Sequence, residues 1–261
     1  AYRRQRQMCI RDSHYRNQSF ILIKMIINFG LIYFMSTNLF SFYNKGSYFK
    51  MDLNQNYLTQ LHQKLDTNIE NLRPYAEDNQ VPIVDKLTLD MIKQLIRMNH
   101  TKNILEIGAA IGYSSMQFSS VANDIHVTTI ERNEDMIALA RNYFHQYGYN
   151  EQIRLIEGNA LETYQQVNDR EYDMIFIDAA KAQSKKFFEL YTPLLRKGGI
   201  VVTDNVLYHG FVSNIDIVRS RNVRQMVKKV QQYNQWLMEQ SGYTTNFLNI
   251  DDGLAISIKG E

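Results

Sequence analysis

Acidic and amide side chains follow three short apolar segments of this chain, each at the point where the segment ends. Glu131 follows one segment, Asp178 follows another, and Asp204 with Asn205 follows a third. If these segments are parallel strands, their carboxyl ends meet at one edge of a sheet, where ligands bind. Like charges gathered there repel one another unless a cation or ligand hydroxyl groups compensate. The pattern therefore indicates a binding site.

Asp178, Asp204 and Asn205 form the first group of candidate ligands. Two carboxylates and an amide oxygen are hard oxygen ligands that suit Mg²⁺, with positions left open for water or substrate. Each residue alone could be a helix cap or a turn residue, but the three together favour a metal site. Lys181 lies about one helical turn after Asp178. It could accept a proton, orient an oxyanion or be an ordinary solvated lysine.

A glycine turn follows another apolar segment, residues 104–107. Gly108 and Gly112 would let the backbone approach a ligand, although a plain strand-to-helix turn has the same spacing. The dinucleotide fingerprint needs glycine where Ala110 stands, so a pyrophosphate is not favoured. Glu131 could accept both hydroxyl protons of a ribose, or stabilise the start of the next helix. Together these signals favour a nucleoside cofactor without a pyrophosphate, a description that S-adenosylmethionine meets.

The elements that must position these residues alternate along the chain. Strands are expected at 104–107, 127–130, 153–156, 174–177 and 200–203, and helices near 112–121, 134–147, 160–166 and 182–195. This alternation predicts an α/β fold with a doubly wound, mostly parallel sheet. After a long helix near 219–240, two last strand candidates at 244–250 and 254–258 predict an antiparallel edge hairpin.

Two helical patterns precede the first strand. Leucine and isoleucine recur at helical spacing over 58–72, and we expect Pro74 to end this helix. A second pattern covers 89–96. The apolar stripe of the first helix could serve a dimer or cover the sheet.

The first fifty residues differ from the rest. Residues 20–36 are the most apolar stretch, and a signal peptide or membrane anchor is one interpretation of them. The stretch is short for a membrane span, however, and contains Lys24 and Asn28. Residues 1–13 look like translated sequencing-adapter DNA, and residues 14–50 read as translated upstream sequence. We therefore expect residues 1–50 to be non-native and the functional domain to comprise residues 51–261.

Charge and cysteine content bear on the possible partners and the cellular compartment of the protein. The whole chain has a formal net charge of +2, but residues 1–50 hold 8 Lys and Arg and only one acid. Residues 51–261 thus hold 21 basic and 26 acidic residues, a net charge of −5. The basic average is therefore no argument for a nucleic-acid partner. The single cysteine, Cys9, excludes an internal disulfide and fits a reducing compartment. We expect a cytoplasmic protein with no membrane partner.

Four motifs resemble the metal-dependent catechol and caffeoyl-coenzyme-A type O-methyltransferases: ILEIGAAIGYSS, TTIERN, YDMIFIDAAK and GGIVVTDNVLYHG. The segments VPIVDK, DNVLYHG, YNQWLM and DGLAIS are most similar to the bacterial tRNA 5-hydroxyuridine methyltransferases. The resemblance covers residues 81–261. It implies a Rossmann-like methyltransferase fold, S-adenosylmethionine and Mg²⁺ as cofactors, and the wobble 5-hydroxyuridine of a tRNA anticodon loop as the acceptor.

The resemblance also implies roles for single residues. Asp178, Asp204 and Asn205 match the family's metal ligands, and Lys181 matches the lysine proposed as its base, so Lys181 and Asp178 are the expected catalytic residues. Cofactor-contacting positions are matched by Val84, Gly108, Ser114, Glu131, Ala160 and Asp178. Asn159 replaces the family's usual aspartate. We expect weaker cofactor binding at most, because asparagine can still accept a hydrogen bond from the adenine amino group.

Three functional classes remain open. The first is a tRNA-modifying enzyme, and the second is a small-molecule catechol-type methyltransferase. The third, a non-catalytic cofactor-binding module, is disfavoured because the metal ligands and Lys181 are all present. Arg221, Arg224 and Lys228 form a basic stripe on the expected long helix. This stripe could grip anticodon phosphates, although a solvated helix face would look the same. A homodimer is also expected.

Overall fold

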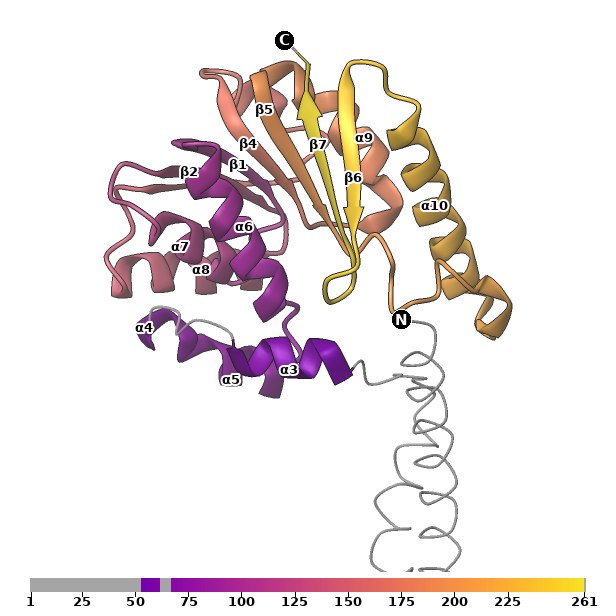
Figure 1. The fold of residues 1–261 in the computed structure, drawn as a ribbon. Coiled ribbons are helices and arrows are strands. Elements are labelled where there is room, and N and C mark those ends of the chain that lie inside the picture. The colour runs from indigo at the N-terminus through magenta and orange to yellow at the C-terminus, as the bar shows by residue number, and fades with distance from the viewer. Residues whose placement is uncertain (1–52, 62–66, 261) are drawn as a thin grey trace, which may run out of the picture. The chain divides into compact units, whose positions relative to one another are not determined.

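The protein is described by a computed structural model that covers residues 53–61 and 67–260, so the expectations for residues 1–50 lie outside the described residues. A seven-stranded sheet has the strand order β3-β2-β1-β4-β5-β7-β6 (Figure 1). The strands are β1 (Asn103–Ile107), β2 (His126–Glu131), β3 (Ile153–Glu157), β4 (Tyr172–Ile177), β5 (Leu195–Asp204), β6 (Tyr243–Leu248) and β7 (Leu254–Lys259). Strands β1 to β5 are parallel, and β7 and β6 add an antiparallel edge. The predicted fold class is confirmed.

Helices cover both faces of this sheet. On one face lie α6 (Lys86–Met98), α7 (Tyr113–Ser119) and α8 (Glu134–Gln146), and on the other lie α9 (Ser184–Tyr191) and α10 (Arg221–Met238). Strands buried on two faces need apolar residues throughout, which explains the continuous runs in the sequence. Because β2 and β4 flank β1 on opposite sides, the strand order reverses between β1 and β4. A ligand crevice is expected at such a reversal.

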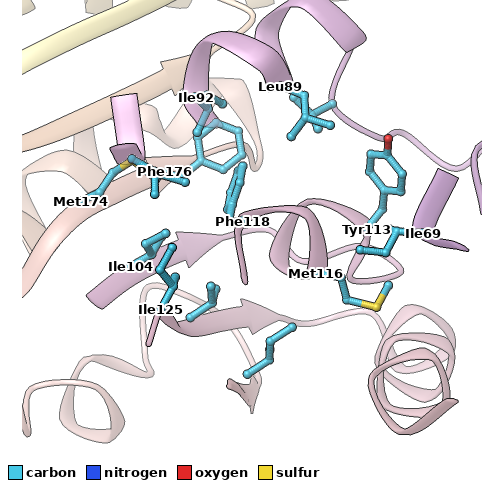
Figure 2. Close-up of a cluster of buried hydrophobic side chains, with 14 of the residues drawn as sticks. Ile69, Leu89, Ile92, Ile104, Tyr113, Met116, Phe118, Ile125, Met174 and Phe176 are labelled. Atoms are coloured by element: carbon cyan, nitrogen blue, oxygen red, sulfur yellow. The ribbon is translucent and has the colours of Figure 1, made fainter. Parts of the chain in front are cut away.

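The core beneath α6 and α7 fixes these helices on the central strands (Figure 2). Phe118 of α7 meets Phe176 of β4 edge to face, with ring centroids 5.4 Å apart and an interplanar angle of 85°. Ile92 of α6 and Ile104 of β1 are fully buried in the same cluster. An aromatic pair of this kind adds about 0.5–1.5 kcal/mol beyond its buried area. The packing holds α7 at the end of the glycine turn.

The segment before α6 differs from the expected single helix over 58–72. It contains α3 (Leu53–Leu61) and α4 (Thr67–Glu70), and Pro74 lies inside α5 (Leu72–Asp78) instead of ending a helix. Pro74 is the third residue of α5. The first turn of a helix tolerates proline because its N–H groups have no partner within the helix.

The expected helix over 160–166 is also absent, and a 3₁₀ turn at Tyr164–Gln166 replaces it. Asn159 explains the difference. Its side-chain oxygen accepts a hydrogen bond from the N–H of Leu161 at 3.1 Å, and its amide donates to Glu162 at 3.0 Å. Such local side-chain bonds compete with helix formation.

The closing hairpin lies beside the end of β5. In the register of β5 and β7, Asp204 pairs with Leu254, and Leu254 also pairs with Leu248 of β6. The turn over residues 249–253 therefore adjoins the residues that follow β5. Among the described helices, none is both long and apolar enough to cross a membrane.

Candidate active site

A cavity of about 290 Å³ opens at the carboxyl ends of the central strands. Its wall includes every position expected to contact a cofactor, together with the lysine that follows β4: Val84, Gly108, Ser114, Glu131, Ala160, Asp178 and Lys181. Tyr113, Gln183 and Phe187 also line it, and the sequence analysis did not assign them to the site. Phe187 carried a signal, since it follows β4 closely and belongs to the apolar face of α9.

Gly108 is required where β1 meets the end of β4. Its φ of +105° is a backbone conformation that side chains disfavour, and a Cβ there would lie 2.3 Å from the backbone oxygen of Asp178. Gly112, with φ +79°, would place a Cβ 2.3 Å from the ring of Phe144. Both glycines are thus explained by close packing, which brings the turn against Asp178.

Glu131 ties the glycine turn to the start of α8. Its Oε2 accepts a hydrogen bond from the N–H of Ala110 at 2.9 Å. Its Oε1 accepts from the N–H groups of Arg132 and Asn133 at 2.8 and 2.9 Å. Ala110 has φ +45°, so this bond holds a non-glycine residue in the left-handed region. A carboxylate has about four acceptor sites, which leaves capacity for a ligand hydroxyl.

Ser114 connects the cavity wall to a buried acid that the sequence analysis missed. Glu106 of β1 is fully buried and accepts hydrogen bonds from the hydroxyls of Ser114 at 2.5 Å, Thr129 at 2.6 Å, and Ser115. Burial raises the pKa of Glu106 to about 7, although the three hydroxyl bonds oppose the shift. The Ser114 hydroxyl thus serves this internal network, while the residue also lines the cavity.

Asp178 and Asp204 end neighbouring strands, because Ile177 of β4 pairs with Thr203 of β5. Asp204 is only 5% exposed. Burial and the negative charge of Asp178 raise the pKa of Asp204 well above its usual range. Nearby, burial and the charge of Asp251 raise the pKa of Asp85 to about 6. Several carboxylates therefore lie close enough to influence one another at this end of the sheet.

Lys181 lies directly against the acid pair. Its Nζ donates a hydrogen bond to Oδ1 of Asp178 at 2.6 Å. Burial alone would lower the pKa of Lys181, but the charges of Asp178 and Asp204 outweigh burial and raise it. The chain does not begin a helix at Asp178, because residues 178–180 are not helical and a 3₁₀ turn starts only at Lys181 (Lys181–Gln183). The contact between Lys181 and Asp178 is therefore made without the expected helical turn.

Asn205 follows Asp204 with φ +60°. Its N–H donates to Oδ1 of Asp204 at 2.7 Å, and its side-chain amide donates to Oδ2 of Asp252 at 3.3 Å. In the described part of the chain, no three His, Cys, Asp or Glu side chains gather closely enough to hold a metal ion. The expected ligand set is not such a group, because its third ligand is the amide oxygen of Asn205. The buried carboxylate of Asp204, the partly buried carboxylate of Asp178 that repels it, and this amide fit a hard cation.

The basic stripe on α10 is only partly free. Arg221, Lys228 and Lys229 are exposed. Arg224 is exposed as well, but its guanidinium donates two hydrogen bonds to the carbonyl of Val218, at 2.8 and 3.2 Å. Arg224 therefore holds the loop that precedes α10.

The chain matches one protein-family model and several known proteins and solved structures. A family model described as O-methyltransferase matches residues 56–260. A solved structure from Staphylococcus aureus, described as a "putative caffeoyl-CoA O-methyltransferase", is 73% identical with a TM-score of 0.78, and the match covers 80% of this chain and 100% of that one. The O-methyltransferase ankF of Aspergillus thermomutatus is 26% identical over 73% of this chain and 89% of its own length.

Other solved structures share the fold. One of them is an SAH-bound methyltransferase from Podospora anserina, 24% identical, with a TM-score of 0.72. The match covers 78% of this chain and 93% of that one.

Proposed function

This chain belongs to the O-methyltransferase family, and we propose that it methylates the wobble 5-hydroxyuridine of tRNA to 5-methoxyuridine, using S-adenosylmethionine and Mg²⁺. The observation that carries the methyl-transfer part of this proposal is that two candidate binding sites lie side by side. The cavity between Gly108 and Glu131 meets the Asp178–Asp204 pair at a single edge of the sheet. A methyl donor in the cavity would therefore face an acceptor oxygen held at the acid pair.

The cavity residues suit a nucleoside cofactor. Gly108 packs the turn against Asp178 at the cavity wall, and the remaining acceptor capacity of Glu131 suits ribose hydroxyls. Asn159 and Ala160 line the same cavity. The SAH-bound fold relative supports S-adenosylmethionine as the donor.

Asp178, Asp204 and Asn205 would hold the metal ion. When bound, the cofactor supplies the methyl group, and the metal lowers the pKa of the acceptor hydroxyl and orients it. The chain's own contribution is positioning. Gly108 presses the glycine turn against the end of β4, and this places the cavity next to Asp178. Lys181 donates to Asp178 and can also stabilise negative charge on an acceptor oxygen.

The decisive experiment is methyl transfer to a tRNA anticodon stem-loop that carries 5-hydroxyuridine. We expect turnover with added Mg²⁺ and none in excess chelator. Asp204→Ala should remove several kcal/mol of transition-state stabilisation, which lowers kcat/KM about 100-fold or more. In cells that lack the protein, mass spectrometry of tRNA nucleosides should show 5-hydroxyuridine in place of 5-methoxyuridine. Full activity in chelator, or unchanged nucleosides, would contradict the proposal.

A small-molecule catechol-type acceptor is the second candidate. It is favoured by the name of the Staphylococcus aureus relative and by the net charge of −5 over residues 51–261. The two candidates separate when the same preparation is given the stem-loop and a simple catechol. The true acceptor should show the far larger kcat/KM.

A further inference from the structure

We propose that Asp252 is a positioning residue for the metal site, because it fixes the orientation of the Asn205 amide. Asp252 belongs to the turn between β6 and β7. The inference rests on the metal requirement of the proposed function, and it assigns a role to a residue outside the expected ligand set.

The backbone first brings the two residues together. The N–H of Val206 donates to the carbonyl of Gly253 at 3.1 Å, and the N–H of Leu207 donates to the carbonyl of Asp252 at 2.9 Å. Gly253 has φ +89°, and a Cβ there would lie 2.4 Å from Cγ of Leu207. The turn and the segment after Asn205 thus pack too closely for Asp252 to move away.

Both carboxylate oxygens of Asp252 then bind that segment. Oδ2 accepts from the side-chain amide of Asn205 at 3.3 Å, and Oδ1 accepts from the backbone N–H of His209. The imidazole Nδ1 of His209 lies 3.7 Å from Oδ2. The Asp252 side chain is 13% exposed, so water competes little for these bonds. One carboxylate therefore organises the chain on both sides of the 206–208 stretch.

The chemistry of an ionised carboxylate decides which way the amide faces. An asparagine side chain can rotate to exchange its oxygen and its NH₂ group, and the two orientations differ little in shape. A carboxylate only accepts hydrogen bonds, so Asp252 binds the NH₂ group of Asn205. The amide oxygen is then directed away from Asp252 and is available as a ligand. Partners that orient a ligand in this way typically change metal affinity by about 10- to 100-fold.

Asp252→Asn tests this logic with almost no change of shape. The new NH₂ group can donate to the oxygen of Asn205, so the orientation that presents this oxygen to a metal loses its preference. Asp251→Asn is the matched control, since it removes the same charge one residue away. Asp251 binds a different element, because its Oδ2 accepts from the N–H of Thr88 in α6 at 2.8 Å.

The measurement is direct binding of Mn²⁺ to the full chain, followed by electron paramagnetic resonance. We expect Asp252→Asn to weaken Mn²⁺ binding by about 10- to 100-fold, Asp251→Asn to leave it within about twofold, and Asp204→Ala to abolish it. Affinity for S-adenosylmethionine serves as the folding check, because Asp252 does not line the cavity. In the activity assay, excess Mg²⁺ should restore the kcat of Asp252→Asn but not that of Asp204→Ala.

The outcomes separate the inference from the function on which it rests. If the wild-type protein binds Mn²⁺ and Asp252→Asn binds it equally well, the positioning role is wrong and the metal site stands. If Asp251→Asn weakens binding as much as Asp252→Asn, the effect is one of net charge, and the inference is overturned. If the wild-type protein binds no Mn²⁺, both the metal site and this inference fall.

Discussion

Glu106 illustrates, at the scale of a residue, how a buried acid depends on pH. In the folded protein its pKa is about 7, against an ordinary value of 4.5. The folded state therefore binds the proton more tightly, and stability falls as the pH rises from about 4.5 through 7. A shift of this size corresponds to about 3 kcal/mol. We expect urea unfolding to show wild-type stability decreasing between pH 5 and pH 8.

Glu106→Gln should remove most of that dependence, because glutamine does not titrate. The variant should lose less stability than the wild-type protein over the same pH range. Ser114, Thr129 and Ser115 can each still hydrogen-bond to the amide. If both proteins respond to pH equally, Glu106 is ionised in the folded state and this prediction is wrong.

Lys181 carries the second prediction at this scale. Lys181→Met removes the group that donates to Asp178 and should lower kcat by about 100-fold or more, a typical loss for a proton-handling residue. Lys181→Arg keeps the charge. Substantial activity in Lys181→Arg would mean that Lys181 acts by its positive charge. Loss of activity in both variants would mean that Lys181 transfers a proton. Full activity in Lys181→Met would exclude either role.

The sequence predicts these residues unequally. Asp178 and Asp204 could be placed together because residues after parallel strands share one edge of the sheet. Glu106 was missed because one acid inside the apolar run of β1 does not reveal which hydroxyls will satisfy it. Asp252 was missed because its contact with Asn205 depends on the register between β5 and β7, which periodicity does not determine.

At the scale of elements, the helices before β1 are tied to the cavity wall. Arg73 of α5 is buried, and its Nη2 donates to the carbonyl of Val84 at 3.2 Å and to the hydroxyl of Tyr113 at 2.8 Å. Tyr113 donates in turn to Glu70 of α4. Val84 and Tyr113 both line the cavity. The helices therefore fix part of the cavity wall.

Arg73→Met should loosen this wall. We expect it to raise the Kd for S-adenosylmethionine about tenfold and to destabilise the fold by about 2 kcal/mol, because charged hydrogen bonds are lost from a buried site. Calorimetric titration and thermal unfolding measure the two effects. Arg97→Met, on the exposed end of α6, is the control and should change neither. Unchanged cofactor affinity in Arg73→Met would make the network purely structural.

The α10 helix makes structural contacts with the loop that precedes it, and it also carries the basic residues of the proposed RNA contact. Three of its side chains hold the loop over residues 206–218 by backbone carbonyls. Arg224 binds Val218, Gln231 binds Val212 at 2.8 Å, and Asn234 binds Val206 at 2.8 Å. This face is structural, which hydrophobic spacing alone did not show. The exposed Arg221, Lys228 and Lys229 are the residues left for an RNA partner.

Arg221→Glu with Lys228→Glu should therefore lower kcat/KM for the hydroxylated stem-loop about tenfold and spare a small catechol. The difference should shrink as salt rises, because screening weakens phosphate contacts. Arg170→Glu with Lys197→Glu makes the same charge change near the amino ends of β4 and β5 and should have no such effect. Equal losses on both substrates, or no loss on the stem-loop, would remove α10 from the RNA path.

At the scale of the whole molecule, the alternation of strands and helices predicted the sheet and its edge hairpin. Most strand positions were accurate because strands covered on both faces leave a strong apolar signal. The exception is β5, which begins at Leu195, inside the helix that was expected over 182–195, whereas α9 already ends at Tyr191. The prediction for the region before α6 was less accurate, since the local effect of Pro74 depends on where a helix begins.

The oligomeric state depends on which surface residues stay exposed in the folded chain. Tyr57, Leu58 and Leu61 of α3 are 59%, 49% and 61% exposed.

These exposed apolar residues lead us to expect the proposed homodimer to use α3. Light scattering after size exclusion should give twice the monomer mass for the wild-type protein. Leu58→Glu with Leu61→Glu should shift the mass toward the monomer, because burying two carboxylates in an interface is unfavourable. Glutamates at the exposed Thr59 and Gln60 of the same helix are the control. A wild-type monomer would contradict the prediction.

The position of β7 next to β5 has a consequence for how the protein is made. Strands β6 and β7 follow every other described strand in the sequence, so they leave the ribosome after the cavity residues have been synthesised. A nascent chain that has not yet released Leu254 lacks the β7 residue that pairs with Asp204 and the turn whose Asp252 binds the Asn205 amide. We therefore expect the proposed metal site to be completed only after this hairpin has left the ribosome.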